Sequence, residues 1–258
     1  MSDTPVGTGG DTLVEKEFWE QEYYWANVQP PCLPDLDMPF DQSMAHALER
    51  LAPAQKGERV IEIGCAPAKW LAYYAQRFGV IADGVEYSEK GANLSQANLD
   101  SLGLEGRIHH ADFFTTEAQR YDVVLSFGFI EHFADLEGVF ARHLDFVNPG
   151  GRLVVGVPNF RGLNKTLQRW SDPAYLALHN LRAMDPALYR RLGDEHGLER
   201  LHQEYIGGPD PIIIKMGKPW VTPLVLAEAR FRRLGFTEKL NSGFASPYLL
   251  TVFQTPAG

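Results

Sequence analysis

The strongest constraint on the fold is an alternation of short apolar runs with stretches of helical periodicity between residues 59 and 159. The runs have the length of strands, and the stretches between them carry apolar residues at the spacing of an amphipathic helix. Strands are expected at 59–64, 80–88, 107–114, 121–128 and 152–159, and helices at 68–79, 91–102 and 136–147. This alternation predicts crossover connections and a mainly parallel sheet. Because such sheets bind ligands at the carboxyl ends of their strands, the chemistry is expected there.

The rest of the chain completes the sheet within a single domain, residues 1–258. A helix at 185–197 and two further strands at 198–208 and 246–256 follow the first five strands. Together they predict an α/β, Rossmann-like fold with a seven-stranded, mostly parallel sheet and helices on both faces. We divide the domain into an N-terminal cap (1–55), a core (56–159), a lid insertion after the fifth strand (160–184) and a C-terminal part (185–258) with a variable insertion at 209–242.

Charge and composition exclude several classes of protein. The net charge is −9, and residues 1–50 contribute −8 of it through ten acidic and two basic residues. A nucleic-acid binder needs a basic surface, so no nucleic-acid partner is expected. No run approaches 18 apolar residues, the polar start does not resemble a signal peptide, and Cys32 and Cys65 lack the spacing of a zinc site. These features predict a cytoplasmic protein without membrane association, and they leave a homodimer open.

Two regions outside the predicted core are candidates to cover a bound ligand. Residues 13–28 are predicted to form an aromatic, acidic helix, and a proline-rich loop and a helix at 40–51 follow it. This aromatic helix is either part of the core or a lid, and its substrate-facing candidates are Tyr23, Tyr24 and Trp25. The insertion 160–184 is the stronger lid candidate because it leaves the fifth strand on the ligand side of the sheet. Its region contributes the candidates Asn159, Arg161, Asn164 and His179.

The most informative segment, Val60-Ile61-Glu62-Ile63-Gly64-Cys65-Ala66-Pro67-Ala68-Lys69, spans the end of the first predicted strand. A strand that ends in an acid and continues through Gly and small residues into a helix is typical of a nucleotide-type loop. The segment lacks GxGxxG and GxxxxGK[ST], which disfavours dinucleotide and phosphate-binding loops of those kinds. It resembles the first motif, (D/E)-x-G-x-G-x-G, of the class I S-adenosylmethionine-dependent methyltransferases.

Four further segments match this family in the same order along the chain. An acid ends the second strand in Gly84-Val85-Glu86-Tyr87-Ser88, and Ala111-Asp112-Phe113 follows the third strand. Ser126-Phe127-Gly128-Phe129-Ile130-Glu131-His132 resembles the fourth-strand motif of members that act on small molecules, and Asn148-Pro149-Gly150-Gly151 resembles the turn before the fifth strand. The resemblance covers residues 56–159 and extends more loosely to 160–206 and 247–255.

The resemblance implies S-adenosylmethionine as the cofactor and assigns residues to its parts. Glu62 would contact the methionine amino group, Glu86 the ribose, and Asp112 and Phe113 the adenine. The other implied cofactor contacts are Gly64, Cys65, Ala66, Tyr87, Ser126 and Phe127. Ala66 and Ala68 replace two glycines of the family motif, so the loop is expected to hold both at negative φ, with Pro67 helping to fix that shape.

The implied reaction is an in-line displacement, in which the protein's main task is to align the reacting atoms. His132 and Glu131 follow the fourth strand, beside the expected position of the methyl group. We favour His132 as general base because an ordinary histidine pKa lies near working pH, and a cofactor-facing wall with no proton role is the alternative for this pair. The Asp/Asp/Asn set of metal-dependent catechol-type enzymes is absent from the sequence, so no metal is expected.

The predicted function is S-adenosylmethionine-dependent methylation of an oxygen or nitrogen of a small molecule, without metal. Aromatic residues are abundant in both candidate lids, which favours an aromatic or hydrophobic acceptor. Two alternatives stay open. A non-catalytic, methyltransferase-like subunit that binds a partner is compatible with the altered glycine loop. A nicotinamide-dependent oxidoreductase fits less well, since it predicts GxGxxG or, in short-chain enzymes, a Tyr-x-x-x-Lys pair.

Overall fold

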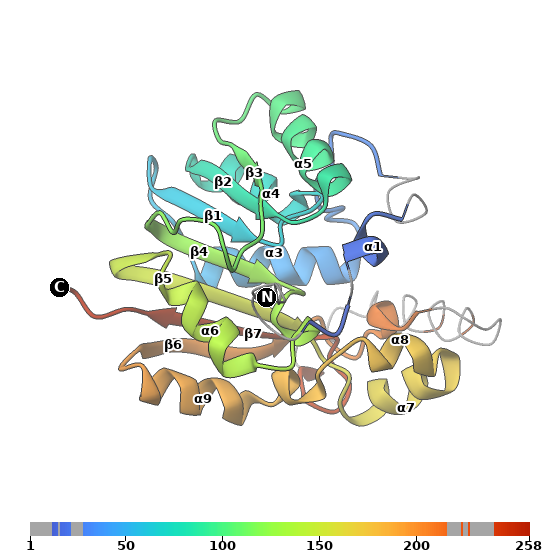
Figure 1. Cartoon of the computed structure of the whole chain (residues 1–258). Coiled ribbons are helices and arrows are strands. Elements are labelled where there is room, and N and C mark those ends of the chain that lie inside the picture. The colour runs from blue at the N-terminus through green and yellow to red at the C-terminus, as the bar shows by residue number, and fades with distance from the viewer. Residues whose placement is uncertain (1–11, 15, 22–27, 216–222, 224–226, 228–239) are drawn as a thin grey trace, which may run out of the picture.

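A computed structural model describes residues 12–14, 16–21, 28–215, 223, 227 and 240–258 of the chain. Its centre is a seven-stranded sheet in the order β3-β2-β1-β4-β5-β7-β6 (Figure 1). The strands are β1 (Arg59–Ile63), β2 (Ile81–Glu86), β3 (Ile108–His110), β4 (Tyr121–Phe127), β5 (Val147–Pro158), β6 (Glu199–Ile206) and β7 (Tyr248–Gln254). The first five strands pair in parallel, and β7 runs antiparallel between β5 and β6. The predicted seven-stranded, mostly parallel α/β sheet is therefore confirmed.

Helices cover both faces of this sheet, as predicted. One face packs against α3 (Pro39–Leu51), α4 (Lys69–Phe78) and α5 (Glu89–Ser101), and its core includes Met44, Leu71 and Leu99. The other face packs against α6 (Leu136–Leu144) and α9 (Pro186–Glu195) through Phe140 and Leu192, among others. Parallel strands that are covered on both sides need apolar residues on both faces, which explains the nearly continuous apolar runs in the sequence. None of the helices in the described part of the chain is long and apolar enough to cross a membrane.

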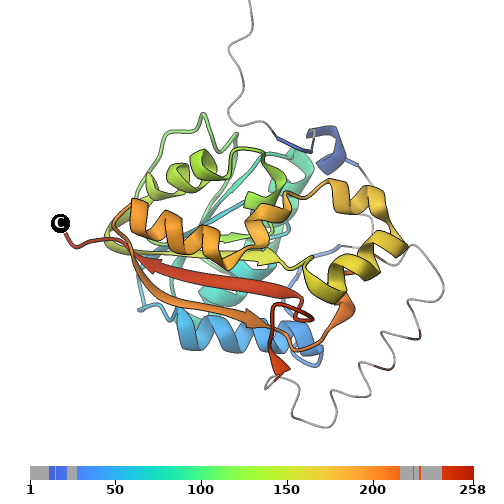
Figure 2. The ribbon, with the colours of Figure 1, turned by 90° about the horizontal axis from the view of Figure 1, so that it is seen from below.

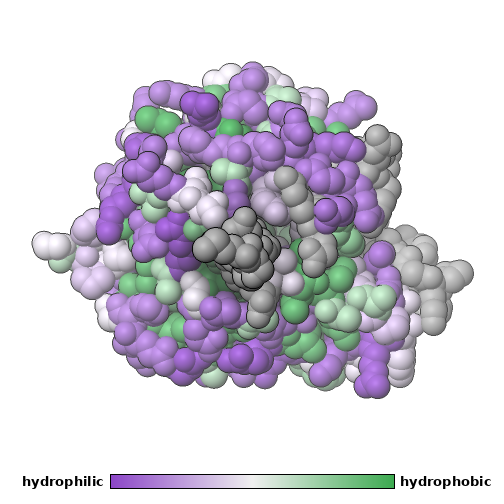
Figure 3. Space-filling model, in the orientation of Figure 1, coloured by the Kyte–Doolittle hydropathy of each residue, from purple (hydrophilic) through white to green (hydrophobic). Residues whose placement is uncertain are grey.

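Three short helical elements follow β5 and form the predicted insertion. They are α7 (Gly162–Ser171), α8 (Pro173–Ala177) and a 3₁₀ turn, η2 (Leu181–Met184). A further 3₁₀ turn, η3 (Pro211–Ile213), lies beyond β6. Figure 3 shows apolar surface on the side of the molecule where α8 lies. Leu163 and Trp170, both in α7, are among the exposed large apolar side chains. The greater part of the variable stretch 209–242, including the helix expected around 222–234, lies outside the described residues.

Several element boundaries differ from the sequence prediction, and local hydrogen bonds explain one of them. The third strand ends at His110 because the Asp112 carboxylate accepts the backbone N–H of Phe114 at 2.8 Å and turns the chain. The fifth strand starts five residues early, since Val147 already pairs with Tyr121 before a register shift. The described part of the aromatic segment 13–28 contains only one helical turn, α1 (Lys16–Trp19). The division into cap, core, lid and C-terminal part stays a prediction.

The N-terminal segment lies across the carboxyl end of the sheet and joins two of its loops. Thr12 forms an antiparallel bridge with Phe133, and the backbone N–H of Leu13 donates to the His132 carbonyl at 2.7 Å. At the other end, the Ser88 hydroxyl donates to the Trp19 carbonyl at 3.3 Å, just before α5. Figures 1 and 2 both place α1 at the same end of the molecule as α7 and α8. This arrangement positions the described N-terminal residues, 12–14 and 16–21, over the strand ends where a ligand is expected.

Candidate active site

A cavity of about 230 Å³ opens at the carboxyl ends of β1, β2 and β4. Its wall combines residues that follow each of these strands with two residues of the N-terminal segment, Thr12 and Trp19. Seven of the ten predicted cofactor residues line it: Gly64, Ala66, Glu86, Tyr87, Asp112, Phe113 and Phe127. The sheet topology therefore brings together residues from four separate loops, as expected for this class of fold.

The loop after β1 depends on Gly64, whose φ is +67°. A Cβ atom at Gly64 would lie 2.6 Å from the Phe129 ring, so both the backbone and the close ring contact require glycine. Ala66 holds a negative φ, as expected, but Ala68 has a φ of +60° and is the one non-glycine residue with positive φ in the described part of the chain. The prediction that both alanines avoid the left-handed region is therefore wrong for Ala68. That residue begins α4, and the strained backbone turns the chain into the helix.

Glu86, at the end of β2, is held in place by the backbone. Its carboxylate accepts the N–H of Ala66 at 3.2 Å and of Ser88 at 2.8 Å, which fixes the two loops around it. Burial raises the pKa of Glu86, and these backbone donors offset part of that effect. The residue still lines the cavity. A carboxylate with this geometry can accept further hydrogen bonds from a ligand's hydroxyl groups.

Glu62 lies within β1, one residue before its end, and lacks a full set of partners. The residue is almost fully buried, and its Oε2 atom has no hydrogen-bond partner. Burial raises the pKa of Glu62 to about 8, while the backbone N–H of Leu71 acts in the opposite direction. An unpaired buried carboxyl oxygen costs free energy, so this position favours a ligand that donates a hydrogen bond or carries positive charge.

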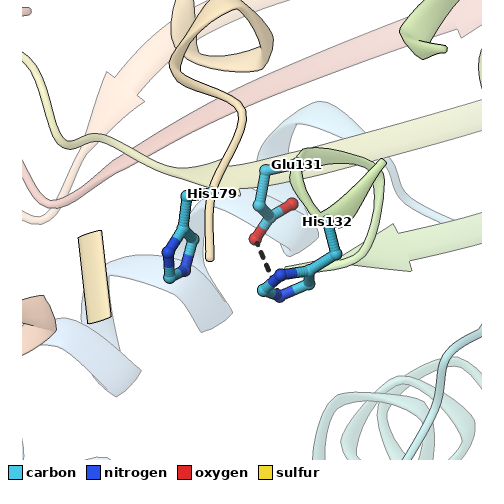
Figure 4. Close-up of side chains that lie close together, drawn as sticks. All are labelled: Glu131, His132 and His179. Atoms are coloured by element: carbon cyan, nitrogen blue, oxygen red, sulfur yellow. Dashed lines mark ion pairs between the residues drawn. The ribbon is translucent and has the colours of Figure 1, made fainter. Parts of the chain in front are cut away.

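A second polar cluster, made of Glu131, His132 and His179, follows β4. Glu131 and His132 belong to the 3₁₀ turn η1 (Ile130–His132), and His179 comes from the segment between α8 and η2. One ligand atom from each of the three lies within 4.8 Å of the others, and Figure 4 shows the side chains facing one another. The Glu131 Oε1 atom is 3.9 Å from His132 Nε2. Of the three residues, His132 lines the cavity.

Burial sets the protonation states in this cluster. It lowers the pKa of His132 to about 4, with the neighbouring His179 acting in the same direction, and it raises the pKa of Glu131 to about 8. The argument that His132 has a pKa near working pH is therefore wrong. His132 is neutral at neutral pH, and once Glu131 is ionised its carboxylate is the stronger base of the two.

Comparisons with known proteins identify the family of this chain. The family model described as "Methyltransferase domain" matches residues 37–203. The chain belongs to the methyltransferase domain family. This confirms the predicted class I S-adenosylmethionine-dependent methyltransferase.

Similar proteins agree with this assignment. This methyltransferase is 30% identical over 148 residues to a ubiquinone biosynthesis O-methyltransferase of Azorhizobium caulinodans. The matched region covers 56% of this chain and 55% of the relative. A second protein of that name, from Coxiella burnetii, is 26% identical over 106 residues, covering 40% and 45%. The chain thus spans about half the length of the curated relatives it matches.

Solved structures share the fold at low sequence identity. A SAM-dependent methyltransferase from Thiobacillus denitrificans, in complex with S-adenosyl-L-homocysteine, aligns with a TM-score of 0.60 at 16% identity, covering 94% of this chain and 99% of that chain. Geranyl diphosphate C-methyltransferase from Streptomyces coelicolor aligns with a TM-score of 0.57 at 18% identity, covering 82% and 78%.

The residues of this methyltransferase fit S-adenosylmethionine. Glu62 does not line the cavity, but its unpartnered Oε2 is an acceptor that an amino group would satisfy. Glu86 presents a carboxylate to the cavity, where ribose hydroxyls would donate to it. Asp112 and Phe113 lie on the same wall. Asp112 also holds the turn after β3 through the Phe114 N–H, so the two roles proposed for it are compatible.

The structure turns the Cys65 and Ser126 side chains away from the methyltransferase cavity. The Cys65 sulfur packs against Gly84 of β2 in the core. Ser126 is buried within hydrogen-bond distance of His143, whose Nε2 lies 3.0 Å from the serine oxygen. Because the other ring nitrogen of His143 donates to the Val139 carbonyl, Nε2 accepts from the serine. The side chains of both residues pack or hydrogen-bond within the sheet, and a backbone contact of either with the cofactor stays a prediction.

The predicted substrate residues have different outcomes. Tyr23, Tyr24 and Trp25 lie outside the described residues. The amides of Asn159 and Asn164 both donate to the Ser246 carbonyl and tie β5 and α7 to the segment before β7, and Arg161 pairs with Asp185 at 3.0 Å. None of these three lines the cavity, because their polar groups hold the base of the insertion together. Of the predicted substrate residues that the structure describes, His179 approaches the site, through the polar cluster.

The sequence argument missed several aromatic residues of the cavity wall. Phe129 and Phe133 flank the two predicted catalytic residues in η1, and their rings are 4.9 Å apart. Phe114 packs edge-on against Phe133, and Trp19 packs edge-on against His132. The motif Phe129-Ile130-Glu131-His132-Phe133 could have indicated the first two of these rings. Both phenylalanines lie within two residues of Glu131 or His132, which were already expected at the reacting centre.

Proposed function

We propose that this methyltransferase transfers a methyl group from S-adenosylmethionine to an oxygen of a small aromatic or hydrophobic molecule. Nitrogen is the second choice of acceptor atom. The observation that carries the proposal is a single cavity whose wall joins the cofactor residues Gly64 and Glu86 to His132 and to an aromatic surface. The curated relatives, named as O-methyltransferases, support oxygen over nitrogen.

The aromatic side of the cavity supports the acceptor class. Trp19, Phe114, Phe129 and Phe133 all line it, so a planar apolar molecule would exchange water contacts for ring contacts there. Each aromatic pair adds roughly 0.5–1.5 kcal/mol beyond the burial of its area. The described wall contains no Lys or Arg, which disfavours a strongly anionic acceptor.

The chain's own residues would perform three tasks in the reaction. The cofactor supplies a methyl group that its sulfonium already activates. Glu62 would accept from the methionine amino group and Glu86 from the ribose hydroxyls. The ring of Phe129, packed against Gly64, shapes the cavity wall. The aromatic wall orients the acceptor toward the methyl group. Glu131, when ionised, can receive the proton that the acceptor hydroxyl loses, either directly or through His132.

Calorimetry followed by a transfer assay tests this function. Titration of the full chain with S-adenosylmethionine should show one binding site. Radiolabelled methyl groups should then appear on phenols of increasing apolar size and, more slowly, on matched anilines. If the chain binds no cofactor, the enzyme interpretation fails. If it binds the cofactor but labels neither class while a candidate partner protein gains label or activity, the partner-binding alternative replaces it.

A further inference from the structure

The Glu131, His132 and His179 cluster has no role in holding the cofactor, and its geometry suggests a different ligand. Two imidazoles and one carboxylate converge from segments 47 residues apart in the sequence. Two hydrogen bonds from Asn180 fix the two segments to each other. Its backbone N–H donates to the Glu131 carbonyl at 2.6 Å, and its side-chain amide donates to the Phe133 carbonyl at 3.0 Å. The approach of the three side chains is thus built into the fold.

Each imidazole is oriented with one nitrogen free. The Nδ1 of His132 lies 3.0 Å from the Leu178 carbonyl, and the Nδ1 of His179 lies 2.9 Å from the Tyr175 carbonyl. A carbonyl only accepts, so both Nδ1 atoms carry the proton and both Nε2 atoms keep a lone pair. A histidine whose outer nitrogen donates to a backbone carbonyl is the usual arrangement of a metal ligand.

Glu131 supplies the second, independent observation. The residue is 1% exposed, and its Oε2 atom has no hydrogen-bond partner. Among the described residues, the one basic side chain within ion-pair distance of Glu131 is His132. No described Lys or Arg forms an ion pair with Glu131. A buried carboxylate without a cation or donor is costly, so this side chain is expected to bind a positive ion.

We propose that Glu131, His132 and His179 bind one divalent transition-metal ion, such as Zn²⁺ or Mn²⁺, at the acceptor end of the cavity. Two imidazole nitrogens favour ions of this kind over Mg²⁺ and Ca²⁺, which prefer oxygen ligands. Metal–ligand distances of about 2.0–2.2 Å require the three ligand atoms, now up to 4.8 Å apart, to move closer when an ion binds. Three protein ligands leave coordination positions open toward the cavity.

The open positions define a role for the ion, and that role rests on the proposed function. In the metal-bound state Glu131 is a ligand of the ion and no longer the proton acceptor. The acceptor hydroxyl would bind the ion and release its proton to solvent, because a bound cation lowers the pKa of a coordinated hydroxyl. Its oxygen then forms the new C–O bond while the C–S bond of the sulfonium breaks, and the bonding electron pair leaves with sulfur. Metal binding itself does not depend on this step.

Direct metal titration tests the site. The full chain, stripped of metal with a chelator, is titrated with Mn²⁺ by electron paramagnetic resonance and with Zn²⁺ against a chromophoric competitor. One ion per chain is expected. His179→Gln and Glu131→Gln should each weaken binding at least about tenfold. The matched controls His110→Gln and Glu117→Gln, both at exposed positions, should leave it unchanged.

Two further measurements keep the outcomes distinct. Circular dichroism and calorimetry with S-adenosylmethionine show whether each variant still folds and binds cofactor, and His179→Gln should do both. If the folded chain binds no ion, or if the two ligand variants bind it as well as the controls do, the metal site is overturned. If the ion binds but the stripped enzyme transfers methyl groups at the full rate, its catalytic role is overturned while the proposed function stands. Loss of cofactor binding in the unaltered chain would overturn the proposed function alone.

Discussion

Two buried glutamates on either side of β1 show how differently the fold can hold a carboxylate. Glu86 is the last residue of β2 and accepts two backbone N–H groups, from Ala66 and Ser88. Glu131 follows β4, and one of its oxygens has no partner at all. Burial raises the pKa of both. Glu86 is therefore prepared to accept hydrogen bonds from a neutral ligand, whereas Glu131 needs a proton or a cation.

Under the proposed function, this difference would separate binding of the cofactor from activation of the acceptor. A carboxylate that the backbone orients keeps its position whether or not a ligand is present, so it suits the cofactor, which must bind in every cycle. A carboxylate left without a partner gains more from a charged ligand. The two ends of the cavity can thus be tested separately.

The largest expected effect is on Glu86. Glu86→Gln replaces an acceptor by a donor where two ribose hydroxyls are expected, and each charged hydrogen bond contributes about 1.5–3 kcal/mol. We expect the affinity for S-adenosylmethionine to fall by about 100-fold, measured by isothermal titration calorimetry.

Two control variants show whether the loss of affinity is specific to Glu86. Glu89→Gln, three residues further on at the exposed start of α5, should bind the cofactor normally. Glu131→Gln, titrated in the presence of a chelator, should also keep its cofactor affinity within about threefold. Equal losses in Glu86→Gln and Glu131→Gln would remove the distinction between the two glutamates.

The second prediction concerns pH and the other buried acid, Glu62. Its folded pKa of about 8 exceeds the ordinary value of 4.5, so between these values the folded chain holds a proton that the unfolded chain has released. Stability of the ligand-free chain should therefore fall as pH rises through this window. His143 behaves oppositely: its folded pKa of about 4 lies below 6.5, so stability should fall as pH decreases through that range.

Thermal unfolding at a series of pH values checks this behaviour. We expect a melting temperature that is highest near pH 5–6 and roughly 5 °C lower at pH 8. Glu131, whose folded pKa is also about 8, adds to the same alkaline decrease, so Glu62→Gln should remove the part that Glu62 contributes. Saturating S-adenosylmethionine should do the same in the unaltered chain if its amino group meets Glu62. An alkaline decrease that persists unchanged in Glu62→Gln would show that this carboxyl is not its cause.

The third prediction concerns Trp19, which contacts both the cofactor side of the cavity, near Glu86, and its acceptor side, at His132. Its backbone carbonyl accepts from Ser88, beside Glu86, and its ring lies 5.2 Å from the His132 ring. Trp19→Ala should weaken binding of the cofactor or the acceptor by about 3–10-fold, because a ring contact of this kind contributes roughly 0.5–1.5 kcal/mol. Calorimetry and the KM of the acceptor measure the two effects.

The control for Trp19 is Trp170, in α7 of the insertion. Trp170 is 62% exposed and does not line the cavity, so Trp170→Ala should leave both constants unchanged. Equal effects at the two positions would indicate that the insertion, which was the stronger lid candidate, also covers the ligand.

The sequence predicted one end of the cavity much better than the other. Gly64, Glu86 and Asp112 each follow a strand, and parallel strands bring their carboxyl ends to one edge, so local patterns were sufficient. His179 was named as a candidate, but its approach to Glu131 depends on the packing of an irregular insertion that no periodicity defines. The pKa of His132 was misjudged for a related reason, since burial is a property of the tertiary structure.

Ala68 carries the smallest expected effect. Its left-handed backbone costs an alanine roughly 1–2 kcal/mol, which Ala68→Gly would remove. Glycine also loses a buried methyl group, about 0.8 kcal/mol, and makes the unfolded chain more flexible by about 0.4–1 kcal/mol. These terms nearly cancel, so the free energy of unfolding, measured with denaturant, should change by no more than about 1 kcal/mol. The cofactor affinity should hold within about threefold.

Gly64→Ala, the opposite exchange at the other positive-φ position of the loop, should lower both the stability and the cofactor affinity, because its methyl group would meet the Phe129 ring. A large gain in cofactor affinity in Ala68→Gly would instead mean that the alanine loop restricts cofactor binding, and that Glu86 alone does not set the strength of this end of the cavity.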